Sequence, residues 1–296
     1  MTAGCAPVIA AAKRARIMDA MGDRGRAGVG TLLAVGALVG LLLAGNWLAT
    51  AGRGLLETGP LRGLFHSEIL RRGFTGWIAG DTMPPAGADA QGTRILPPVA
   101  APSGPHAFLQ KDGGRPVTYS PCRRLSVVVN PEGAPFGAVR TVRDAVARIS
   151  TATGLSLEVS GTTDENYREK RKAYQPNRYG ERWAPILVAW AGSGRVPEFD
   201  HGAVGFGGSV AIDPAVGASS YVTGAVVLDR DWFADPANQP YLTEVLLHEL
   251  GHVVGLDHVT DDEQIMWEGG LHGADLGPGD LAGLARLGKG PCTPDL

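Results

Sequence analysis

A histidine-rich segment at residues 248–258 constrains this chain of 296 residues more than any other feature. It reads HELGHVVGLDH. His248 and His252 stand four residues apart, so on a helix both side chains project from one face and can bind one metal ion. Gly255 permits the left-handed conformation that ends a helix, so the chain can turn and bring His258 back toward that ion. The segment therefore predicts a helix that ends at a metal site.

Three imidazoles and one adjacent carboxylate are typical of catalytic zinc. Three neutral imidazoles leave one position of a tetrahedral zinc ion open for water, whereas a structural zinc site has four protein ligands. Glu249 can reach that water without binding the metal, which suits a general base. We therefore predict one catalytic Zn²⁺ held by His248, His252 and His258, with Glu249 as the base. Residue types alone do not decide whether a structural calcium or a second zinc is also bound.

The rest of this helix is apolar on the side opposite the two histidines. One face is therefore expected to meet the core and the other the metal. The apolar positions are Thr243, Leu246, Leu247, Leu250 and Val254.

The complete pattern of two histidines, glycine and a third histidine resembles the signature of the metzincin metallopeptidases, in its matrixin version. Met266 lies at a matrixin-like distance after His258 and is similar to the methionine of the turn beneath the metal. Residues 276–284 resemble the helix that comes after this turn, with Asp280 at an acidic position. The resemblance implies an α/β (α+β) fold with a mixed, mostly parallel twisted sheet, an active-site helix and a C-terminal helix. It also implies an endopeptidase that acts on peptide or protein substrates.

Several positions depart from the vertebrate matrixins. Val259 stands where those enzymes usually have Ser, Gly279 replaces an acidic residue, and Trp267-Glu268 replaces Tyr-Pro. No Tyr lies two residues after Met266, and no Pro-Arg-Cys-Gly sequence occurs. Neither a tyrosine ligand nor latency through a cysteine switch is therefore expected.

Two other functions remain open. In a gluzincin-like peptidase, Glu263 or Glu268 would be the third ligand in place of His258. In a non-catalytic interpretation, the chain is a zinc-stabilised extracellular module that binds peptides without cleaving them. Glu249 argues against that module, because a binding protein has no use for a carboxylate beside the metal-bound water.

Hydrophobic periodicity predicts a strand, a helix and four further strands before the histidine helix. The expected elements are a strand at 125–129, a helix at 136–153, strands at 155–159, 186–190, 209–212 and 221–228, and the histidine helix from about 240. By resemblance, residues 202–208 correspond to the edge strand that pairs with substrate, although four glycines also fit a flexible loop. Residues 165–183 are predicted to be a solvated connector rather than a flap over the substrate.

Residues 27–52 contain no charged side chain and are long enough to cross a ~30 Å hydrocarbon layer as a helix. Basic residues precede this segment, which places residues 1–26 in the cytoplasm and the remainder outside. A single-pass anchor in the cell membrane is therefore expected. Secretion after signal cleavage near Ala51 is the alternative, because Ala49-Thr50-Ala51 offers a small-residue cleavage site.

Composition divides the chain beyond residue 52 into two parts. Residues 53–118 are rich in Gly, Pro and Ala and are predicted to be a linker or propeptide, and residues 119–296 the catalytic domain. Cys122 and Cys292 bracket this domain in an oxidising compartment and are predicted to pair, with two separate thiols as the alternative. The net charge of −3 gives no basic stripe, so no nucleic-acid partner is expected.

Overall fold

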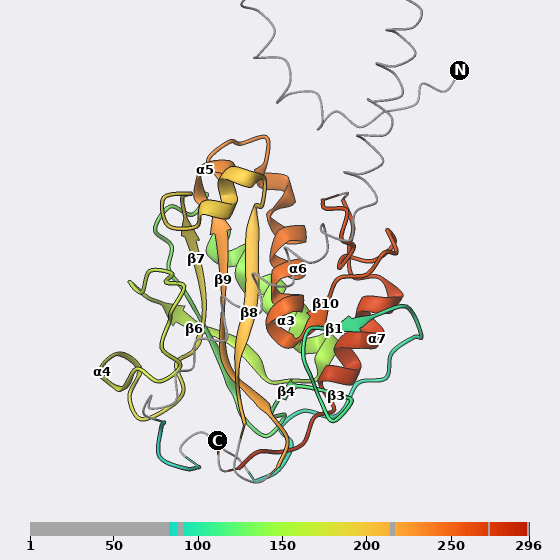
Figure 1. Cartoon of the computed structure of the whole chain (residues 1–296). Coiled ribbons are helices and arrows are strands. Elements are labelled where there is room, and N and C mark those ends of the chain that lie inside the picture. Colours follow the sequence, from blue (N-terminus) through green and yellow to red (C-terminus); the bar gives the residue numbers. More distant parts are fainter. Residues whose placement is uncertain (1–82, 88–91, 214–216, 272, 295) are drawn as a thin grey trace, which may run out of the picture. The chain divides into compact units, whose positions relative to one another are not determined.

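A six-stranded mixed sheet organises the part of the chain that the structure describes (Figure 1). The structure is a computed structural model that describes residues 83–87, 92–213, 217–271, 273–294 and 296. The main strands run in the order β6-β5-β7-β9, with β8 and the short β4 both pairing with β9. Their bounds are β4 Thr118–Tyr119, β5 Leu125–Val129, β6 Leu157–Thr162, β7 Ile186–Ala191, β8 Gly205–Ile212 and β9 Ser220–Asp229. Every pairing is parallel except that of β8 with β9. The predicted mixed, mostly parallel sheet is confirmed.

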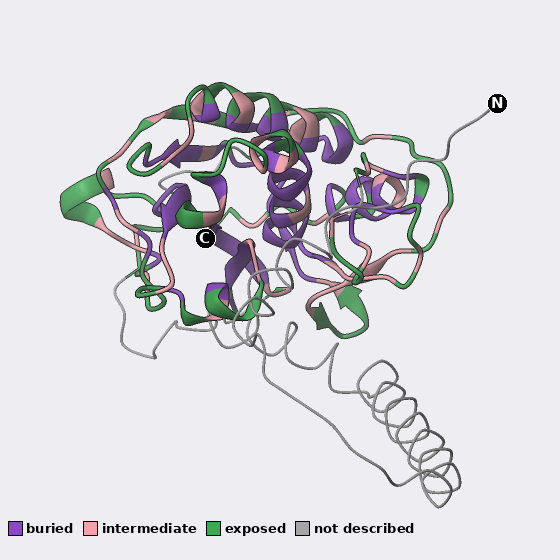
Figure 2. Ribbon diagram, turned by 90° about the horizontal axis from the view of Figure 1, so that it is seen from above, coloured by how far each residue is buried: buried purple, intermediate pink, exposed green. Residues whose placement is uncertain are grey.

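Three helices pack together over one face of this sheet. They are α3 (Ala138–Thr153), α6 (Leu242–Val254) and α7 (Pro278–Leu287). The core lies beneath them because alternate strand residues point to the same face: Val127 and Val129 belong to it, whereas Val128 belongs to a cluster on the other face. Helix α6 is buried along most of its length (Figure 2), which suits a helix that packs against both β8 and α3. The histidine helix is therefore held from two sides.

Residues 163–185 and 192–203, on either side of β7 in the sequence, cover the opposite face of the sheet. These segments include α4 (Pro176–Tyr179) and the 3₁₀ helix η1 (Pro197–His201). Tyr167 and Phe199 pack there against side chains of β5, β7, β8 and β9. The expectation of a solvated connector is wrong for several residues of the first segment, because Glu165, Tyr167, Ala173 and Trp183 are buried.

Residues 92–118, which composition assigns to a linker, pack against the domain. β1 (Ala107–Phe108) pairs with β10 (Leu256–Asp257), and β2 (Lys111–Asp112) forms a hairpin with β3 (Arg115–Pro116). The Arg94 guanidinium donates to the carbonyl oxygens of Gly288 at 2.6 Å and Gly154 at 3.0 Å. Pro-rich sequence can thus form short strands and backbone contacts at the edge of the domain.

A disulfide joins Cys122, just before β5, to Cys292, after α7, with 5.4 Å between their Cα atoms. Two short elements, α5 (Arg230–Phe233) and η2 (Gln239–Tyr241), connect β9 to α6. The predicted apolar segment 27–52 lies outside the described residues. Within the ranges described, no helix has both the length and the apolar character needed to cross a membrane.

Candidate metal centre

The structure brings the three predicted ligands together. His248 and His252 project from α6, and the chain turns at Gly255, whose φ of 119° ends the helix in the left-handed region. Strand β10 then carries the chain to His258. The Nε2 atoms of the three rings lie 3.1 Å from one another in every pairing. Among the described residues, these histidines form the one group of three or more His, Cys, Asp or Glu side chains arranged to hold a metal ion.

Backbone carbonyls orient two of the three rings. Nδ1 of His248 donates to the carbonyl oxygen of Ile265 at 2.7 Å, and Nδ1 of His252 donates to that of Leu256 at 2.9 Å. Because a carbonyl can only accept, each Nδ1 carries the proton, so in the neutral ring Nε2 presents a lone pair. Lone pairs that face one another at 3.1 Å repel unless a cation lies between them.

The separation of the nitrogens fits zinc. A tetrahedral ion with Zn–N bonds of ~2.0–2.1 Å has its ligand nitrogens about 3.3–3.4 Å apart, close to the separation observed here. Backbone carbonyls behind ligating imidazoles are also the usual outer partners of such sites. The chain therefore holds a donor set suited to Zn²⁺.

Glu249 lies on α6 against the beginning of the edge strand β8. A Cβ added at Gly205 would lie 3.0 Å from its Oε1, and one added at Gly207 would collide with its carbonyl oxygen. Burial raises the pKa of Glu249 to about 8, although a hydrogen bond from the backbone of Gly207 opposes this shift. The two glycines thus allow β8 to approach the helix closely enough to enclose the carboxyl group.

Met266 is buried beneath α6. Its Sδ lies against Gly251, where an added Cβ would be 2.7 Å from the sulfur. The turn that carries Met266 is fixed to the third-histidine segment, because the amide of Val259 donates to its carbonyl oxygen at 2.9 Å. The neighbouring Ile265 carbonyl accepts from His248. The methionine turn therefore supports the histidine helix from below.

Asp280 in α7 ties this turn to the C-terminal helix. Its carboxylate accepts from the amides of Ile265 at 2.7 Å, Met266 at 3.3 Å and Gly277 at 2.8 Å. Burial raises the pKa of Asp280, and these backbone hydrogen bonds oppose the shift. Sequence reasoning marked Asp280 through the resemblance alone.

Two further buried polar side chains were not predicted from the sequence. Gln264 is buried, and its Oε1 accepts from the amides of Gly279 at 2.7 Å and Asp280 at 3.1 Å. Glu244, in the first turn of α6, accepts from the amide of Gly273 at 3.2 Å. Little in the sequence singled out Glu244, because a glutamate in the first turn of a helix ordinarily interacts only with the helix dipole.

The rival third ligands lie elsewhere. Glu263 and Glu268 are exposed, and neither belongs to the three-histidine group of the described residues.

The mostly parallel sheet with an antiparallel edge strand, and the helix that carries two histidines of the three-histidine group, agree with the architecture that the resemblance implies. A family model described as Matrixin matches residues 182–272, from just before β7 to beyond the methionine turn. This match confirms the predicted resemblance to a matrixin-like metzincin peptidase and supports a zinc metallopeptidase in general. The comparison with curated proteins found no match.

Proposed function

We propose that this chain is a zinc-dependent endopeptidase in which His248, His252 and His258 hold the ion and Glu249 is the general base. The convergence of the three Nε2 atoms, each 3.1 Å from the other two, carries the proposal. The matrixin match adds support, because it spans all four residues.

Bound zinc supplies a Lewis acid that makes water nucleophilic near neutral pH and polarises the scissile carbonyl. The residues of the chain do the remainder. Glu249 accepts a proton from the attacking water and later gives it to the leaving amine. Burial favours the neutral form of Glu249, whereas a bound dication would favour the carboxylate that accepts this proton. Met266 packs under the helix and supports the rings without binding the metal.

The substrate proposed is an extended peptide. β8 pairs with β9 on one side, and its first residues lie beside Glu249. A peptide can add to such an edge through main-chain hydrogen bonds, which would place a peptide bond near the metal centre.

The deciding experiment uses the full, zinc-loaded chain and a mixed peptide library. We expect internal cleavage that stops when a chelator removes the zinc and returns when zinc is restored. Elemental analysis run in parallel separates the outcomes. Protein that contains zinc but cleaves nothing would favour the peptide-binding module, and protein that never retains zinc would refute the metal centre.

The third ligand can be tested separately. We expect H258A to lose zinc and E268Q to retain it, because Glu268 is exposed and outside the histidine group. Loss of zinc in E268Q alone would support the gluzincin-like alternative.

We further propose that residues 27–52 deliver residues 119–296 across the membrane, either as an anchor or as a cleaved signal. The Cys122–Cys292 disulfide suits the oxidising side of that membrane. N-terminal sequencing of the mature protein, with fractionation of cells and medium, distinguishes an anchor from cleavage near Ala51. Recovery of the uncleaved chain in the cytosol would contradict both.

A further inference from the structure

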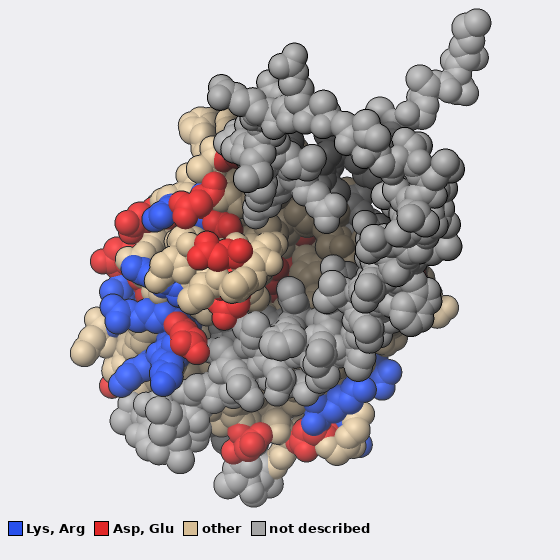
Figure 3. Space-filling view, turned by 45° about the horizontal axis from the view of Figure 1, so that its top comes forward, with Lys and Arg blue, Asp and Glu red and all other residues tan. Residues whose placement is uncertain are grey.

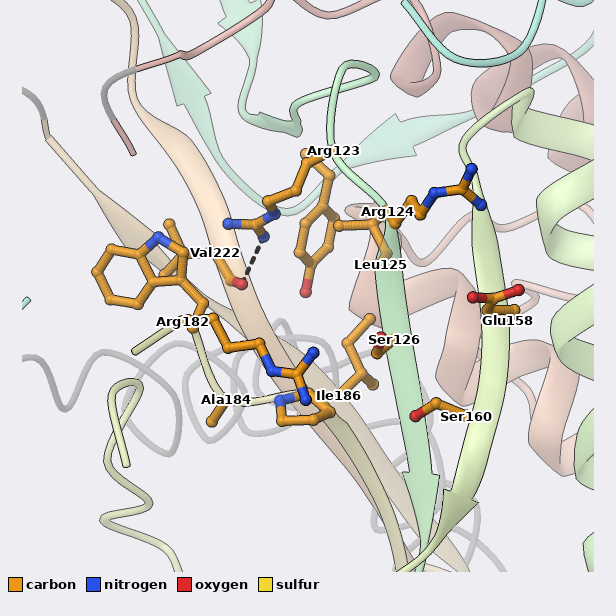
Figure 4. Close-up of a pocket in the computed structure, with 13 residues that line it drawn as sticks. Arg123, Arg124, Leu125, Ser126, Glu158, Ser160, Arg182, Ala184, Ile186 and Val222 are labelled. Carbon is orange, nitrogen blue, oxygen red and sulfur yellow. Dashed lines mark hydrogen bonds between the residues drawn. The ribbon is translucent and has the colours of Figure 1, made fainter. Parts of the chain in front are cut away.

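A cavity of about 490 Å³ lies on the sheet face away from α3 and α6 (Figure 4). Ser126 of β5 and Glu158 and Ser160 of β6 line it. These side chains alternate with Val127 and Val159, which face the helical core, so the cavity opens on the other face of the sheet. It is therefore distinct from the candidate metal centre beside α6.

Three arginines surround this cavity, which we call the arginine pocket. Arg123 and Arg124 come from the turn before β5, and Arg182 comes from the segment before β7 (Figure 4). Glu158 is the one acidic residue of the lining, so the charged lining groups sum to three positive and one negative. Basic and acidic side chains lie side by side on the face shown in Figure 3, whereas the lining of the arginine pocket is predominantly basic.

Two of these cationic side chains donate to backbone carbonyls. Arg123 is buried and donates to the carbonyl oxygen of Val222 at 2.6 Å. Nε of Arg182 donates to the carbonyl oxygen of Tyr179 at 2.8 Å. Within the described ranges, the ion pairs involve other arginines, and neither Arg124 nor Arg182 forms one. A guanidinium has five N–H groups, so donors remain for a ligand at Arg124 and Arg182.

Trp183 also lines the pocket and is buried. Its Nε1 atom has almost no accessible surface and no hydrogen-bond partner within the described structure, so it does not face the cavity. Recognition of a ligand in the pocket therefore depends on the arginines, whose guanidinium groups supply the excess positive charge.

We propose that the arginine pocket binds a small oxyanion ligand, one that carries carboxylate or phosphate groups. Guanidinium groups recognise both by paired hydrogen bonds, which are stronger than those between neutral groups. The site is separate from the peptide-binding edge proposed for β8, so it would bind a second ligand and not the peptide being cleaved.

The test is isothermal titration of the full chain with inorganic phosphate and, separately, with succinate at low ionic strength. We expect the double variant R124Q/R182Q to bind the preferred probe at least about tenfold more weakly than the wild type, because it loses two charge-assisted contacts. The tighter probe identifies the ligand as phosphate- or carboxylate-bearing.

The matched control is R143Q/R195Q, which removes two exposed arginines outside the lining and changes the net charge equally. We expect this control to bind within about twofold of the wild type. Equal weakening in both double variants, or no measurable binding of either probe to the wild type, would overturn the proposal. Circular dichroism and zinc content of each variant establish that the fold is intact. Any heat that remains in R124Q/R182Q reports binding elsewhere, including at the metal centre.

Discussion

Two clusters of polar side chains, on opposite faces of the sheet, follow different chemical rules. In the histidine cluster, three nitrogens of the same kind lie 3.1 Å apart. In the other, which we call the Glu165 cluster, the carboxylate of Glu165 accepts from Nε and Nη2 of Arg171, both at 2.9 Å. It also accepts from Gln175 at 2.7 Å and from Tyr179 at 2.7 Å. Arg171 also donates to Thr223 at 3.1 Å. Matched donors and acceptors indicate a structural role, whereas converging like atoms indicate an ion site.

The two buried glutamates show the same contrast in their acidity. Burial raises the pKa of Glu249 to about 8. Only one backbone hydrogen bond acts against burial there, and it is too weak to cancel the increase. Burial also acts to raise the pKa of Glu165, but the hydrogen bonds and charge of Arg171, with Gln175 and Tyr179, outweigh it and hold this pKa below its ordinary value. Burial therefore does not determine the charge of a carboxyl group until its partners are known.

The largest expected effect tests the role of Glu249. E249Q keeps the size of the side chain but removes the base, so peptide cleavage should fall by on the order of 10²–10⁴-fold. Zinc content should not change, because Glu249 is not a ligand in this proposal. The control is E268Q, an exposed carboxylate on the neighbouring turn, which should retain activity. Comparable kcat values for E249Q and the wild type would show that Glu249 is not the general base.

The second prediction tests the structural role of the Glu165 cluster. R171M leaves a carboxylate buried without its cation and should lower the free energy of unfolding by about 3–5 kcal/mol. The double variant E165Q/R171M should recover part of this loss. Urea denaturation measures both. R178M is the matched control, because Arg178 pairs with the exposed Asp164 and should matter little. Equal losses of unfolding free energy in R171M and R178M would mean that the buried ion pair stabilises the protein no more than the exposed one does.

A third prediction concerns Asp280, which holds the backbone that orients the metal ligand His248. D280N weakens the acceptor that holds the amides of Ile265 and Met266, and the Ile265 carbonyl orients His248. We expect zinc affinity to fall by up to about tenfold, the lower end of the effect of a direct outer partner, because Asp280 acts on His248 only through the backbone of Ile265. Competition with a chromophoric chelator measures this affinity. D262N, which alters an exposed aspartate, should bind zinc normally. E165Q should also bind zinc normally if the two clusters are independent.

The smallest effect is a pH dependence of stability. Because the pKa of Glu165 is lower in the folded protein than in the unfolded chain, its contribution is complete above the unfolded value of about 4.3 and is lost as pH falls through the folded pKa. The stability difference between the wild type and E165Q should therefore shrink between about pH 5 and pH 3. E181Q, which removes an exposed carboxylate, should show no such trend. A constant difference for E165Q across this range would contradict the linkage.

Some of the fold was predictable because local pattern and tertiary environment agree. Strand β5 is a run of β-favouring residues closed by Asn130-Pro131, and helix α3 has an apolar period of three to four residues. Both lie within two residues of their expected bounds. The prediction of β8 was less certain, since its glycines fit a loop equally well. In the structure these glycines belong to a strand that packs closely against α6. A side chain at Gly207 would collide with Glu249, so the close packing requires glycine there.

Spacing along the chain was enough to predict the three histidines, because a helical turn followed by a glycine turn brings them together without help from distant sequence. Only the tertiary structure decided that Arg171 neutralises Glu165, that Gln264 and Asp280 join α7 to the methionine turn, and that three arginines surround one cavity. Those partners come from segments that meet only after the sheet forms. Their contacts depend on long-range packing, for which a single sequence carries no local signal.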